Sequence, residues 1–119
     1  MDLKIYISSN YSRCNEANEL AKYFIESGHE ILSLWHEEDK QPKCSLTQAL
    51  RNIWGIQQCD LFILLSGNKI TSGNRSFEFG VAYSNKKKII VIDRNEKSLF
   101  ELLPGISHYE SIEELKRTI

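Results

Sequence analysis

The sequence predicts an open parallel α/β sheet of about five strands with helices on both faces, formed as one domain over residues 1–119. Two observations support this. Short apolar runs alternate along the chain with segments whose apolar residues recur at helical spacing. Residues 60–66 (DLFILLS) and 88–93 (KIIVID) are continuous apolar runs without a polar face, which is typical of strands buried on both sides in a parallel sheet. Right-handed crossovers between such strands place helices on both faces.

The first half of the chain contains two predicted strands, each followed by a helix. Residues 3–8 form a strand that the polar residues 9–12 end, and Gly28 lies where the C-cap of the following helix is expected. That helix is predicted from Ala17, Leu20, Ala21, Phe24 and Ile25. Residues 31–35 form the second strand. Ser45 and Gln48 make a capping box for a helix whose apolar face carries Leu46, Ala49, Leu50 and Ile53.

The second half continues the alternation. After the strand at 60–66, residues 67–73 are rich in turn formers, and a helix passes through Phe77, Val81 and Ala82. The strand at 88–93 is followed by a short helical piece at 99–103 and a turn at Pro104 and Gly105. We then expect a short edge strand at 106–109 and a helix that begins at Ser111.

Composition excludes several classes of protein. The chain has 15 basic and 16 acidic side chains, whereas sequence-independent binding to nucleic acid requires an excess of Lys and Arg. Its three cysteines are widely spaced without a CxxC pair, so we expect reduced thiols and no zinc site. No apolar run approaches the length of about 20 residues that a membrane span needs, and the N-terminus has no signal-peptide pattern. We therefore expect a cytoplasmic protein that has no metal or cofactor and binds neither membranes nor nucleic acid polymers.

Ligands of parallel sheets bind outside the carboxyl ends of the strands, which directs attention to the loops at residues 8–13, 35–44, 66–76 and 93–98. In the first, residues 8–13, Arg13 and the free N–H groups of the following helix favour an anion such as phosphate. The alternative is that Asn10 or Ser12 caps the helix and Arg13 faces water.

The loop and helix at 71–82 contain Glu78, which we place in the first turn of the helix beside Phe77 and Phe79. Gly80 is expected to let the backbone pack closely. A carboxylate in the positive field of a helix N-terminus stays ionised, and it can act as a nucleophile toward an oxocarbenium-like sugar. The alternative is a glutamate that only stabilises the helix dipole.

Three segments of the sequence resemble those of the nucleoside 2-deoxyribosyltransferase family. They are residues 4–8 (KIYIS), residues 57–60 (QQCD) before an apolar strand, and residues 76–83 (SFEFGVAY) before residues 88–91 (KIIV). The superfamily also includes deoxynucleoside 5′-monophosphate N-hydrolases. The similarity extends over residues 4–93, and its most specific part is the E-x-G-x-A motif at 78–82.

The resemblance implies a Rossmann/flavodoxin-like fold of the deoxyribosyltransferase type, with Glu78 as the nucleophile that attacks the anomeric carbon. It also implies that Ser72 contacts a 5′-phosphate, as in the hydrolase branch. Asn52 aligns with a family aspartate that works with the nucleophile, and it cannot take up a proton at neutral pH. The candidate substrate ligands are Tyr6, Ser9, Asn10, Arg13, Asn52, Ser72, Asn74 and Ser76.

The predicted function is cleavage or transfer at the N-glycosidic bond of a (deoxy)nucleoside or its 5′-monophosphate. Two alternatives stay open: a nucleotide-binding or interaction module that has lost catalysis, which Asn52 motivates, and a TIR-like domain that cleaves NAD. The resemblance also implies a homodimer or larger homo-oligomer. Tyr23, Trp54 and Tyr83 lie at or near the edges of apolar helix faces, where a monomer would leave them partly exposed.

Overall fold

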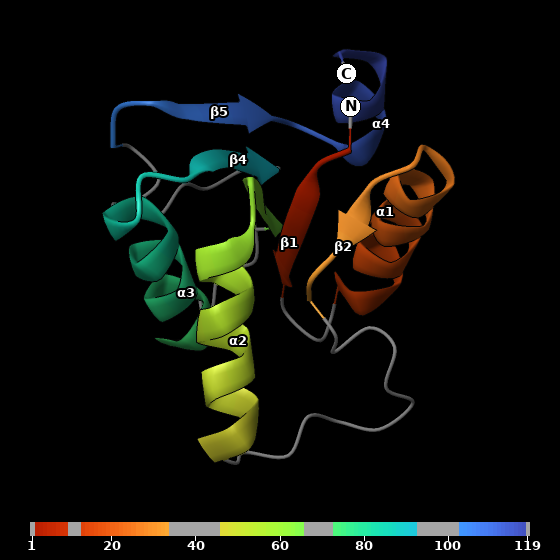
Figure 1. Ribbon diagram of the computed structural model, residues 1–119. Coiled ribbons are helices and arrows are strands. Elements are labelled where there is room, and N and C mark those ends of the chain that lie inside the picture. Colours follow the sequence, from red (N-terminus) through yellow and green to blue (C-terminus); the bar gives the residue numbers. More distant parts are fainter. Residues whose placement is uncertain (1, 10–12, 34–45, 66–72, 93–102, 119) are drawn as a thin grey trace.

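The computed structural model describes residues 2–9, 13–33, 46–65, 73–92 and 103–118. Within them, five parallel strands form one sheet in the order β2-β1-β3-β4-β5 (Figure 1). The strands are β1 (Lys4–Ser9), β2 (Glu30–Ile31), β3 (Leu61–Leu65), β4 (Lys88–Ile92) and β5 (Ile106–Tyr109). This confirms the predicted parallel α/β class, with β5 as an edge strand.

Helices cover both faces of the sheet, as Figure 1 shows. Helices α1 (Cys14–Glu26) and α4 (Ile112–Thr118) pack on one face. Helices α2 (Leu46–Gln58) and α3 (Gly73–Ser84) pack on the other. The two-residue period of the strands divides the core accordingly. On β3, Leu61, Ile63 and Leu65 belong to the α1/α4 side, whereas Phe62 and Leu64 belong to the α2/α3 side.

The strand order reverses between β1 and β3. From β1 the chain adds β2 on one side and then returns to add β3, β4 and β5 on the other. The crossovers that leave β1 and β3 therefore diverge, and the carboxyl ends of these two strands form the position where ligands of open α/β sheets bind. All five residues of β3 are buried, so the predicted strand buried on both sides is confirmed, and it is the middle strand of the sheet.

Strand β2 is shorter than the predicted strand at 31–35. Beyond Ile31, the Leu32 N–H still donates to the Ile5 carbonyl at 2.8 Å, but the Ile7 N–H donates to the buried hydroxyl of Ser33 at 3.2 Å. A side-chain hydroxyl here accepts from a backbone N–H of β1, and residues 32 and 33 lie outside the strand. Residues 34 and 35, the predicted Ser45 cap and residues 99–102 lie outside the described part of the chain.

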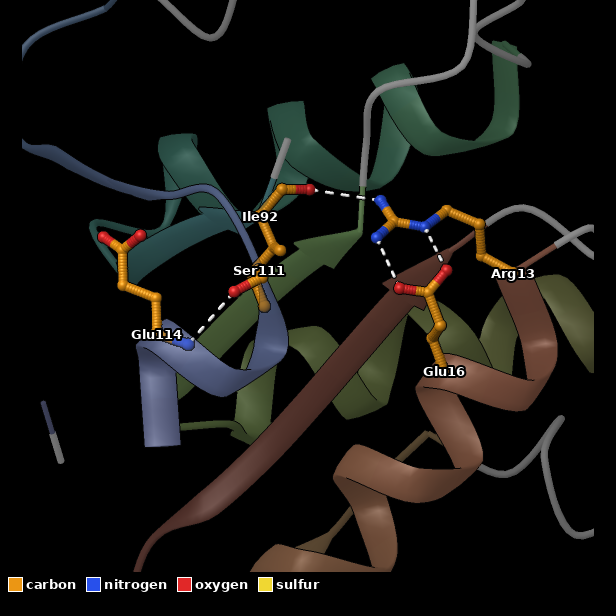
Figure 2. A network of polar contacts seen from close by, with 5 residues as sticks. All are labelled: Arg13, Glu16, Ile92, Ser111 and Glu114. Carbon is orange, nitrogen blue, oxygen red and sulfur yellow. Dashed lines mark hydrogen bonds and ion pairs between the residues drawn. The ribbon is translucent and has the colours of Figure 1, made fainter. Parts of the chain in front are cut away.

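Two other predicted helix ends are confirmed. Gly28, at φ +94°, follows α1 in the left-handed region that favours glycine. At the start of α4, the Glu114 N–H donates to the Ser111 hydroxyl at 3.1 Å (Figure 2). Of the helices that the structure describes, none combines the length and the apolar character needed to cross a bilayer.

Arg13, a predicted phosphate ligand, lies immediately before α1 and is 7% exposed. Its Nε and Nη2 donate to the two carboxylate oxygens of Glu16 at 3.0 and 2.8 Å. Its Nη1 donates to the Ile92 carbonyl at the end of β4, at 3.2 Å (Figure 2). The guanidinium therefore links the start of α1 to the carboxyl end of β4.

We expect Arg13→Ala to lower the free energy of unfolding by about 1–2 kcal/mol, because the Ile92 carbonyl and the Glu16 carboxylate would lose their donors. Urea unfolding followed by circular dichroism measures this change. Arg51→Ala, on the exposed surface of α2, is the matched control and should stay within about 0.5 kcal/mol of wild type. Equal effects of the two substitutions would contradict a linking role for Arg13.

Candidate functional site

The carboxylate of Glu78, on α3, is held by two hydroxyl groups of β1 at the point of strand-order reversal. Tyr6 Oη donates to Glu78 Oε2 at 2.7 Å, and Ser8 Oγ donates to Glu78 Oε1, also at 2.7 Å. Each carboxylate oxygen thus has its own donor, at the short distance typical of hydrogen bonds to a charged acceptor. This arrangement fixes both the position and the rotation of the carboxylate.

Glu78 does not lie in the first turn of its helix, so that prediction is wrong. Helix α3 begins at Gly73, which makes Glu78 its sixth residue. The field of a helix N-terminus falls off within the first turn. The two hydroxyl donors from β1 therefore stabilise the charge that the helix dipole was expected to stabilise.

Tyr6 is a buried donor that cannot easily lose its proton. Its side chain is 1% exposed, and its ring stacks on Phe62 with centroids 5.8 Å apart and planes at 8°. Burial first, and then the neighbouring Glu78 carboxylate, raise the pKa of Tyr6 far above its ordinary value of 10.0. The phenol therefore stays protonated and remains a donor to Glu78.

Gly55 on α2 allows the Tyr6 ring to occupy this position. A Cβ at residue 55 would lie 3.1 and 3.2 Å from ring atoms Cδ2 and Cε2 of Tyr6, and 3.4 Å from the Leu32 carbonyl oxygen. The close approach expected at Gly80 is not found, because a Cβ there would meet no described atom within 4 Å. The packing role that the sequence suggested for Gly80 thus belongs to Gly55.

Ser8 contacts Glu78 in the candidate site, whereas the sequence suggested its neighbour Ser9 instead. Ser8 is 1% exposed and lies two residues after Tyr6, so both side chains project from the same face of β1. Ser9, half-buried at the end of the strand, lies on the opposite face. The strand period was the available signal, because a residue two positions beyond a pocket-lining Tyr6 shares its face.

Asn52 is half-buried on α2, three residues before Gly55, so the two share a helix face. Helix α2 leads back to the start of β3 and therefore runs opposite to the strands. Asn52 accordingly lies nearer the carboxyl edge of the sheet than Gly55 does, just as Ser8 lies nearer that edge than Tyr6. Along α2, Asn52 therefore lies closer to the carboxyl edge of the sheet than the contact between Gly55 and the Tyr6 ring.

For two of the remaining predicted ligands, the structure gives only the position along α3. Asn74 lies in the first turn of α3, and Ser76 is exposed on the same helix. Asn10 and Ser72 lie outside the described residues. Within the part of the chain that the structure describes, no group of three His, Cys, Asp or Glu side chains is arranged to hold a metal ion.

Comparison with known proteins identifies the fold. No family model matches the chain, and neither does any curated protein. Among solved structures, the chain is similar to the CMP N-glycosidase of Clostridium botulinum, with TM-score 0.71 and 18% identity over 97% of this chain and 96% of that one.

Two transferases show the same likeness. The 2-deoxyribosyltransferase of Bacillus psychrosaccharolyticus gives TM-score 0.72 and 15% identity, covering 95% of this chain and 90% of that one. The 2-deoxyribosyltransferase of Leishmania mexicana gives TM-score 0.64 and 19% identity, covering 88% and 77%. The chain therefore has the nucleoside 2-deoxyribosyltransferase-like fold that the sequence resemblance implied.

Proposed function

We propose that the protein cleaves or transfers the N-glycosidic bond of a (deoxy)nucleoside or its 5′-monophosphate, with Glu78 as nucleophile. The observation that carries the proposal is the Glu78 carboxylate, held by Tyr6 and Ser8 where the strand order reverses. The shared fold supports it, since the similar structures are those of an N-glycosidase and of deoxyribosyltransferases.

In this mechanism a lone pair of the Glu78 carboxylate attacks the anomeric carbon. The bond from that carbon to the base breaks, and its electron pair leaves with the base, which takes a proton from solvent. The sugar remains as an ester of Glu78 until water or a second base attacks the same carbon. Fixed hydrogen bonds to the carboxylate reduce the reorganisation that the attack requires.

Among candidate substrates we favour a deoxynucleoside 5′-monophosphate. By the resemblance to the nucleoside 2-deoxyribosyltransferase family, Ser72 corresponds to an acidic residue of the transferase branch. A neutral hydroxyl, unlike a carboxylate, does not repel a phosphate. Arg13 adds positive charge near the carboxyl edge, although Glu16 compensates part of it. We assign the sugar and phosphate contacts to Ser9, Asn10, Ser72, Asn74 and Ser76, with Arg13 fixing the start of α1.

Asn52 supports a second candidate function, a nucleotide-binding or interaction module without turnover. An amide can donate a hydrogen bond to the base but cannot deliver a proton. Loss of a partner carboxylate is a change that leaves binding intact while weakening catalysis. Turnover therefore decides between the two candidates.

We expect the protein to release free base from at least one member of a panel of nucleosides, 5′-monophosphates and NAD, assayed by chromatography. Glu78→Gln should lower that release about a thousandfold or more, because the amide is a poor nucleophile. Glu26→Gln, at the exposed end of α1, is the matched control and should retain full activity. Unchanged release of base by Glu78→Gln would reject Glu78 as the nucleophile. Nucleotide binding without release of base would favour the nucleotide-binding or interaction module. Release from NAD alone would favour the TIR-like domain.

Asn52→Asp should raise kcat about ten- to a hundredfold, since a carboxyl group near the base can donate the proton that its departure requires. The gain should fall as the pH rises and this new acid loses its proton. Asn52→Ala should show no gain at any pH. A pH–rate series on the three proteins tests the placement of residue 52, and equal rates for Asp and Ala would contradict it.

We also propose that the protein forms a homodimer through α2 and α3. These helices expose large apolar side chains: Leu50 and Trp54 on α2, and Phe77 and Tyr83 on α3, which are 56, 59, 58 and 39% exposed. Tyr23, in contrast, packs against the core and lies beneath Lys116, whose Nζ is 4.9 Å from the ring centroid. It belongs to α1, on the other face of the sheet from α2 and α3, and so lies away from this contact.

Light scattering coupled to gel filtration should give about twice the chain mass of 13.8 kDa at micromolar concentration. Trp54→Glu should shift the protein to the monomer, because the partner surface would have to bury a charge. Lys22→Glu, exposed on α1, should leave the mass unchanged. A monomeric wild-type protein would reject the dimer.

A further inference from the structure

The two donors to Glu78 lie at different depths in the sheet. Ser8 is opposite Leu64 of β3, and Tyr6 is opposite Phe62. Two residues of strand correspond to about 6.6 Å, so the backbone of Ser8 is nearer the carboxyl edge, where a substrate would enter. The oxygen Oε1 accepts from Ser8, the donor whose backbone is nearer the carboxyl edge, while Oε2 accepts from Tyr6, whose backbone is deeper in the sheet.

The two donors also differ in freedom. The Tyr6 ring is confined by Phe62 on one side and by the close approach of Gly55. Its hydroxyl can move away from Oε2 only if the ring moves. The Ser8 hydroxyl turns about a single bond, so it can leave Oε1 without any change in the backbone.

Building on the proposed function, we propose that Ser8 is a positioning residue that presents Glu78 Oε1 as the attacking atom, while Tyr6 retains Oε2. In the first half-reaction, Oε1 bonds to the anomeric carbon and the base leaves with the electron pair. Oε2 becomes the carbonyl oxygen of the ester and keeps its bond to Tyr6. In the second, water bonds to the anomeric carbon, the C–Oε1 bond breaks with its electron pair returning to Oε1, and a water proton passes to solvent.

Ser8 then acts mainly in the second half-reaction. As negative charge returns to Oε1, a donor beside it stabilises the departing carboxylate. In the first half-reaction the same hydrogen bond has to weaken, because Oε1 gives its charge to the new bond. Removal of the Ser8 hydroxyl should therefore slow breakdown of the glycosyl-enzyme more than its formation.

Rapid-quench kinetics with the best substrate of the panel separates the two half-reactions. We expect Ser8→Ala to slow breakdown about tenfold or more relative to formation, so that a glycosyl adduct accumulates and is visible by intact-protein mass spectrometry. Ser8→Thr should restore breakdown, and Ser84→Ala, exposed on the same helix as Glu78, should behave as wild type. Equal slowing of both half-reactions by Ser8→Ala would overturn the proposal.

A second measurement needs no turnover. Carbon-13 NMR of glutamate-labelled protein, with the Glu78 carboxyl signal assigned by its loss in Glu78→Gln, follows protonation of this group directly. Ser8→Ala should move its titration midpoint to higher pH, because the carboxylate loses a donor, and Ser8→Thr should reverse the shift. An unmoved midpoint would overturn the role of Ser8 even if catalysis is found, whereas absence of turnover with a moved midpoint would reject only the proposed function.

Discussion

A carboxylate placed between a strand and a helix must be supplied with hydrogen-bond donors, and much of this structure follows from that requirement. Glu78 is partly buried against β1, where an unpaired charge would be costly. Tyr6 and Ser8 meet the requirement because the strand period brings them to the same face. Gly55 then allows the long side chain of Tyr6 to lie under α2. Three elements distant in sequence are thereby fixed around one functional group.

The fold was predictable because its signals are local. The apolar run of β3 and the helical spacing in α1 identify their elements without reference to the rest of the chain. The end of β2 was not predictable in this way. There the hydroxyl of Ser33 accepts from the N–H of Ile7, a contact between residues that only the folded sheet brings together.

Of the residues predicted for the candidate site, the structure brings Glu78 and Tyr6 into contact, and it adds Ser8, which was not among them. Glu78 stands out through its position after a buried strand and through the E-x-G-x-A motif. The two partners of Arg13 differ in their distance along the sequence. Glu16 is three residues away, whereas Ile92, at the end of β4, is 79 residues away. Similarly, no sequence pattern distinguishes a glycine that faces a ring, such as Gly55, from one that faces open space, such as Gly80.

That contrast between the two glycines bears on how the protein could be engineered. Glycine inside a helix costs about 1 kcal/mol relative to alanine, so both positions look like equal targets for stabilisation. At Gly80 an added methyl group meets open space and the helix would gain. At Gly55 the same methyl would press on the ring of Tyr6, whose hydroxyl donates to the Glu78 carboxylate. Position 55 of α2 therefore keeps a glycine whose replacement would disturb the candidate site, and stabilising substitutions have to be made at other positions.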